Sequence, residues 1–115
     1  MRPERLYLTE MISAADTVAR FLDGVPKRTF DVDLLLQSAV MYQLVVIGEA
    51  AAHVGHATRG RHPQVPWNDI VGFRNFAVHA YFSTDWDLVW HAAVTETPAL
   101  RRDLIAVLAG LGPEP

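Results

Sequence analysis

Hydrophobic residues recur at three- and four-residue steps along much of the chain, which is the spacing of a buried face on an α-helix. The clearest example predicts a helix from about Glu4 to Leu22. Its apolar face consists of Leu8, Met11, Ile12, Ala15, Val18, Ala19 and Leu22. No segment shows the sustained two-residue alternation that is typical of half-buried β-strands. The pattern therefore predicts an all-α protein.

A second, longer helix is expected from near Asp31 to about His56, with Thr29 or Asp31 as its N-terminal cap. Its sequence, LLLQSAVMYQLVVIGEAAAHV, is apolar around most of the helix circumference. Such a helix belongs either at the centre of a bundle or in a subunit interface, and the sequence leaves both open.

Turn-forming residues divide the second half of the chain. Residues 58–66 contain Gly60, Pro63 and Pro66 and are expected to form a loop. A third helix is then predicted from about Trp67 to Ala80.

Two further helices are expected after residue 83. The first should open with a capping box made by Thr84 and Asp87 and extend to about Thr95. The second should begin with Thr97 as its cap and end near residues 110–112. These helices together predict an up-down bundle of four or five helices.

Composition supports a single globular domain covering residues 1–115. Half of the residues are hydrophobic and 20% are charged, which excludes a disordered chain. The absence of Cys excludes disulfides and thiolate metal sites and fits a reducing compartment. The sequence MRPERLYLTE lacks the apolar core of a signal peptide, and no apolar run approaches the roughly 20 residues that cross a bilayer. We therefore expect a cytoplasmic protein that has no membrane partner.

The formal net charge of −3 excludes a broadly basic surface for binding polyanions. Any contact with nucleic acid must then come from a local cationic cleft. Arg28, Arg59, Arg61 and Arg74 are candidates for such a cleft, although most surface arginines are simply solvated.

The stretch RNFAVHAY, residues 74–81, places three polar side chains in an otherwise apolar helix. Burying such groups without partners costs several kcal/mol, so we expect Arg74, Asn75 and His79 to have a functional or structural role. At about 100° per residue, Asn75 lies about 40° from His79 and between it and Arg74, which is about 140° away. Arginine presents a planar charged fork that matches phosphate oxygens, and histidine moves protons near neutral pH.

These residue types suit cleavage of an RNA phosphodiester by its own 2′-hydroxyl group. The reaction needs a base, an acid and a fixed cation beside the phosphorus, but no metal ion. Two copies of the helix that face each other across a twofold axis would supply two imidazoles. A polar network that only stabilises a helix interface explains the same residues, and the spacing alone leaves both interpretations open.

Glu49, His53 and His56 share one face of the expected second helix and have workable spacing for a metal site. A full site needs a further ligand, and no Glu-x-x-His motif recurs on another helix. We therefore favour a protein without a metal, in which Glu49 pairs with His53 or lines the RNA cleft near His79.

Longer motifs resemble the HepT-like toxins of the HEPN superfamily. RNFAVHAYF at residues 74–82 fits the pattern R-N-x-x-x-H-x-Y of that family. The flanking segments that also match, in order, are AVMYQLVVIGEAAAHV at 39–54, HPQVPWNDIVGFRN at 62–75 and DWDLVWHAAVTETPALRRDL at 85–104. The resemblance covers about residues 30–104. One departure is Ala80, where the family commonly has Gly.

The resemblance implies an HEPN-like, homodimeric bundle that acts as a metal-independent endoribonuclease without a cofactor. Many such proteins are toxins of a type VII-like pair, silenced when an MntA-like nucleotidyltransferase antitoxin transfers AMP to the motif tyrosine. By position, Arg74 and His79 become catalytic, Asn75 supporting, and Tyr81 the AMPylation site. The resemblance includes Glu49 without fixing its role, and we expect it to be a supporting residue. The alternative is a non-catalytic, nucleotide-binding or scaffold partner of a nucleotidyltransferase. The sequence does not identify the RNA target.

Overall fold

The computed structural model describes the backbone of residues 3–79 and 84–112, and the side chains of these residues apart from 76–79. Every regular element in these ranges is helical, which confirms the all-α prediction. The elements are α1 (Glu4–Leu22), α2 (Lys27–Phe30), α3 (Leu34–Ala51), α4 (His56–Arg61), α5 (Trp67–His79), α6 (Trp86–His91), the π-helical turn η2 (Ala92–Glu96) and α7 (Thr97–Gly110).

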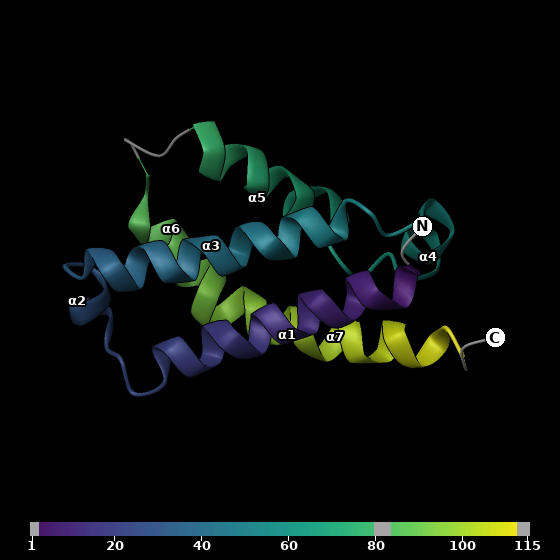
Figure 1. Ribbon diagram of the computed structural model, residues 1–115, viewed down its shortest axis with the longest axis horizontal. Helices are drawn as coiled ribbons and strands as arrows, with labels where there is room; N and C mark the ends of the chain where they lie inside the picture. Colours follow the sequence, from purple (N-terminus) through teal and green to yellow (C-terminus); the bar gives the residue numbers. More distant parts are fainter. Residues whose placement is uncertain (1–2, 80–83, 113–115) are drawn as a thin grey trace.

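The four longest helices alternate in direction and form the predicted up-down bundle (Figure 1). Helix α3 lies in the middle, with α1 against one side and α5 against another, and α7 packs along α1. Helix α1 begins, and helix α7 ends, at the same end of the bundle, beside α4 (Figure 1).

The core forms because the apolar stripes of α1 and α3 face each other. The stripe of α1 buries Leu8, Met11, Ala14, Ala15 and Val18, close to the predicted set, although Ala19 is exposed. The facing residues of α3 include Val40, Leu44, Ile47 and Ala51. Burying a side chain of Val, Leu or Met fully stabilises the fold by about 1.5–3 kcal/mol.

Helix α3 has the central place in the bundle that was one of the two places expected from its apolar sequence. By length and composition it is the one helix in the described ranges that passes a test for a membrane span, with 44% of that window buried. The central helix of a globular bundle passes the same test, and here α1 and α5 cover its inner face. The cytoplasmic location stays a prediction.

The start of the expected second helix is wrong, because a short separate helix precedes it. Asp33, rather than Thr29 or Asp31, caps α3, and its carboxylate accepts a hydrogen bond of 3.0 Å from the Leu36 amide. The buried Gln37 side chain donates to the Phe30 carbonyl at 2.9 Å and so ties α2 to α3.

The end of that helix is also wrong, because α3 stops at Ala51 and not near His56. The Arg59 guanidinium donates to the carbonyls of Ala51 and Val54, at 2.9 and 3.0 Å, and so satisfies backbone acceptors at the helix end. The Glu4 carboxylate accepts from the amide of Gly55, which precedes α4. Residues 58–61, expected in a loop, therefore lie in α4.

Two predicted caps near the C-terminal half are also wrong. Asp85 caps α6 instead of Thr84, and its carboxylate accepts from the amides of Asp87 and Leu88 at 3.1 Å. Thr97 does not cap α7; its hydroxyl donates to the Ala92 carbonyl at 2.7 Å. The π-helical turn η2 carries the chain from α6 into α7 without a break.

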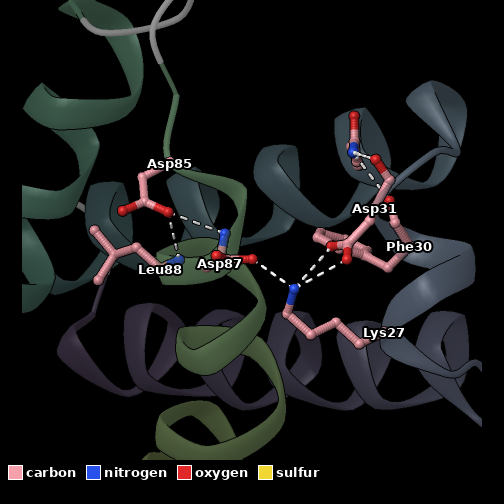
Figure 2. A network of polar contacts seen from close by, with 7 residues as sticks. Lys27, Phe30, Asp31, Asp85, Asp87 and Leu88 are labelled. Atoms are coloured by element: carbon pink, nitrogen blue, oxygen red, sulfur yellow. Dashed lines mark hydrogen bonds and ion pairs between the residues drawn. The ribbon is translucent and has the colours of Figure 1, made fainter.

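A polar network joins α2 to α6 across the left end of the bundle in Figure 1 (Figure 2). The Lys27 ammonium contacts the carboxylates of Asp31, at 2.9 Å, and Asp87. The hydrogen bonds that Lys27 donates to Asp87 and then to Asp31 raise the pKa of Lys27 above its usual 10.5. Because the three side chains are between 37% and 77% exposed, the pairing fixes the position of α2 more than it stabilises the whole fold.

We expect Lys27→Met to lower the free energy of unfolding slightly at neutral pH. A raised folded-state pKa means that this contribution is present below pH 10.5 and is lost as the pH rises through the folded pKa. The free energies of unfolding of the native protein and the variant, measured with urea between pH 7 and 11.5, should therefore converge as the pH rises. Arg28→Met, which removes the neighbouring exposed cation, should not give this pH dependence; identical profiles for both variants would contradict the assignment.

Candidate active site

Helix α5 holds Arg74 against the C-terminal part of α3. The Trp67 ring is buried at the start of α5, and its indole N–H donates to the His62 carbonyl at 3.1 Å, which anchors the helix. Ile70 and Arg74 then follow on the face that meets α3, where both lie close to Gly48. The expectation that Trp67 begins the motif helix is confirmed.

The Arg74 guanidinium joins two elements of the candidate site. One nitrogen lies 3.2 Å from a Glu49 carboxylate oxygen on α3, and the other donates to the Asn75 side-chain oxygen at 3.3 Å. The Arg74 and Glu49 side chains are 37% and 52% exposed. The cation is therefore held in a defined place while part of it remains open to a ligand from solvent.

Glu49 pairs with Arg74 and not with His53. The His53 ring instead stacks on Tyr7, with ring centroids 4.7 Å apart and planes 14° apart. His56 is the first residue of the separate helix α4, so the single helical face expected for Glu49, His53 and His56 does not exist. Among the described residues, no group of three His, Asp or Glu side chains could hold a metal ion.

The motif helix is continuous from Trp67 through His79, so the spacing used for the helical wheel holds. Asn75 and His79 therefore lie one turn apart on one side of α5. Asn75 is exposed and contacts Arg74. The His79 side chain and Tyr81 lie outside the described part of the chain, so their roles stay predictions.

The other candidate arginines do not gather around Arg74. Arg28 lies in α2, whereas Arg59 and Arg61 lie in α4, at the opposite end of the bundle (Figure 1). Arg59 is engaged with the carbonyls at the end of α3. Of these four residues, only Arg74 belongs to the polar motif.

A cavity of about 390 Å³ lies between α5 and the η2–α7 segment. Its walls include Leu44, Ile70, Phe73 and Leu100, and its ionisable residues are Asp69, Glu96 and Asp103. All three are acidic, and none of the described residues that line the cavity is cationic, so it does not suit a phosphate group. The polar motif, with Arg74, Asn75 and the backbone of His79, is the better candidate for chemistry on RNA.

Arg74 and His79 on one helix of a helical bundle fit the class of helical ribonucleases that the resemblance above implies. The comparison of the sequence with protein families agrees. The profile of the family described as Ribonuclease HepT-like matches residues 11–107. The chain therefore belongs to the HepT-like ribonuclease family, and its class of activity is that of a ribonuclease.

Several relatives match nearly full length at low identity. A protein of Methanocaldococcus jannaschii named "Putative RNase MJ1380" is 28% identical over 90% of this chain and 94% of its own. One of Caldanaerobacter subterraneus subsp. tengcongensis, named "Putative RNase TTE0752", is 28% identical over 94% and 96%. "Probable ribonuclease HepT" of Thermococcus cleftensis is 28% identical over 87% and 91%. No solved structure matches the chain.

Proposed function

We propose that the protein is a metal-independent endoribonuclease in which Arg74 and His79 act on one RNA phosphodiester. The observation that carries this proposal is the half-exposed Arg74 guanidinium, held by Glu49 and Asn75 on the helix that also bears His79. Glu49 and Asn75 already orient the Arg74 guanidinium. RNA binding therefore loses less conformational entropy than it would if a free arginine side chain had to be ordered.

The reaction follows from the chemistry of these groups. One imidazole removes the proton of the ribose 2′-hydroxyl as the oxygen attacks phosphorus. The bond from phosphorus to the 5′-oxygen breaks, and a second group, acting as the acid, donates a proton to that leaving oxygen. Arg74 stabilises the charge that gathers on the phosphoryl oxygens. The products are a 2′,3′-cyclic phosphate and a 5′-hydroxyl end.

A homodimer would supply the second imidazole, and the outer face of α3 supports this assembly. Leu35 and Tyr42 are 82% and 65% exposed, and they lie on the helix side opposite the buried face. The same stripe continues through Val46 to Glu49, since these positions fall within about 60° of one another. Exposed apolar surface next to a candidate site marks an interface.

The finer biological role in our proposal is that of the toxin of a toxin–antitoxin pair. The partner would be an MntA-like nucleotidyltransferase that transfers AMP from ATP to the Tyr81 hydroxyl and releases pyrophosphate. Tyr81 lies seven residues beyond Arg74 in the same motif, so an added phosphate there would compete for the Arg74 cation. The match with the family motif over residues 74–82 supports this role.

RNA cleavage in excess chelator tests the catalytic assignment. We expect the native protein to cut, and Arg74→Ala or His79→Ala to lower the rate by about 10²-fold or more, because each removes a group that acts in the transition state. Arg28→Ala, in α2 and outside the motif, is the control and should retain activity. The cleaved 3′ ends should carry a 2′,3′-cyclic phosphate.

Equal cleavage by the native protein and both site variants would exclude this mechanism. If the native protein leaves RNA intact but binds a nucleotidyltransferase, the non-catalytic alternative is the better description.

The proposed dimer predicts that Tyr42→Asp shifts the protein to monomer in sedimentation velocity. A carboxylate at the centre of the apolar stripe would be buried without a partner in the dimer. Cleavage should fall with the dimer fraction and recover as protein concentration rises. Ile105→Asp, at an exposed apolar position on α7, should leave the assembly unchanged. An unchanged sedimentation coefficient for Tyr42→Asp would place the interface elsewhere.

AMPylation is tested by intact mass after incubation with the partner nucleotidyltransferase and ATP. The native protein should gain one or more AMP units and lose its cleavage activity. Tyr81→Phe should gain none, whereas Tyr42→Phe, at an exposed tyrosine of α3, should gain as much as the native protein. Mass gain in Tyr81→Phe would show that another residue accepts the group.

A further inference from the structure

A glycine occupies a point of close contact between α3 and α5, beside Arg74. Gly48 is buried in the second half of α3. A Cβ atom built on it would lie 2.9 Å from the Ile70 carbonyl oxygen and 3.2 Å from the Arg74 Cβ. The first distance is too short for a carbon–oxygen contact, and the oxygen belongs to the backbone of α5, so α5 itself would have to move.

The presence of glycine here has a cost in the helix. Glycine inside an α-helix is less favourable than alanine by about 0.5–1 kcal/mol. Gly48 lies within a helix that is otherwise rich in Leu, Val and Ala, so helix formation does not explain it. Close approach of α5 does explain it, because only glycine leaves room for the Ile70 carbonyl.

We propose that Gly48 is a positioning residue for Arg74, an inference that rests on the proposed function. The contact lies one residue before Glu49 and directly against the Arg74 backbone. It therefore sets the separation between the carboxylate and the guanidinium, whose nearest atoms are 3.2 Å apart. Removing this close approach would move Arg74 outward and away from both Glu49 and the bound phosphate.

The size of the effect follows from how strictly catalysis depends on geometry. A misplacement of about 1 Å at a reacting group lowers a rate by as much as about 10²-fold. Gly48→Ala adds a single methyl group without adding charge. We expect it to lower kcat for RNA cleavage by about 10- to 100-fold, with a smaller change in KM, because the charges that attract RNA are unchanged.

A matched control comes from the facing helix. Gly72 is also inside a helix, but a Cβ atom there would meet nothing within 4 Å. Gly72→Ala makes the same chemical change on α5 and should keep native cleavage. The comparison separates a general effect of Gly→Ala in a helix from the specific contact at Gly48.

Nuclear magnetic resonance gives a readout that does not depend on RNA. In the native protein, proton cross-peaks should connect the Gly48 Hα atoms with the Arg74 Hβ atoms. In Gly48→Ala, the Arg74 Nε–Hε signal and the amide signals of residues 70–74 should shift. Gly72→Ala should leave the Arg74 Nε–Hε signal in place.

The outcomes are distinguishable. Absent native cross-peaks, or an unmoved Arg74 signal in Gly48→Ala, would overturn the inference even if the native enzyme cleaves RNA. A moved signal with native kcat would equally overturn it. If the native protein does not cleave RNA, the proposed function fails, while the Arg74 signal still decides whether Gly48 sets the position of this residue. If Gly48→Ala does not fold, the native cross-peaks decide the contact.

Discussion

The arrangement of this protein depends on one constraint: α3 is apolar on nearly every side, but the bundle covers only part of it. Burial of Val40, Leu44 and Ile47 holds the core together. The outer stripe, with Leu35 and Tyr42, remains exposed in the single chain. The stripe ends at Glu49, the carboxylate that holds Arg74. The helix that organises the core therefore also fixes the candidate site, and it offers the surface through which two chains would meet.

The sequence predicted long-range architecture better than local boundaries, for physical reasons. Helix α1 was predicted with its bounds because its stripe repeats regularly and turn residues follow it at once. The expected second helix was wrong at both ends because its breaks depend on contacts from elsewhere. Arg59 reaches back to the Ala51 carbonyl, and Glu4 reaches Gly55 from a position 51 residues away. Spacing along the chain contains no signal for such contacts.

The candidate site shows the same division. The polar residues of the motif stand out in the sequence because they interrupt an apolar helix, and α5 keeps their spacing through His79. The partner of Arg74 was not predictable, because Glu49 lies 25 residues away from Arg74. His53 is much nearer to Glu49 in sequence and was therefore the expected partner of Glu49. The close contact at Gly48 was also missed; a glycine inside an apolar helix was the available signal.

The pairing of Arg74 with Glu49 has a consequence for how the resting protein meets polyanions in the cell. A guanidinium already neutralised by a carboxylate, in a chain of net charge −3, produces little long-range attraction for nucleic acids. Association with RNA would then be slow, and collisions with strands that do not fit the site would not lead to binding. Selectivity must arise at short range, when a correctly shaped strand brings a phosphate close enough to compete with the resident counter-ion.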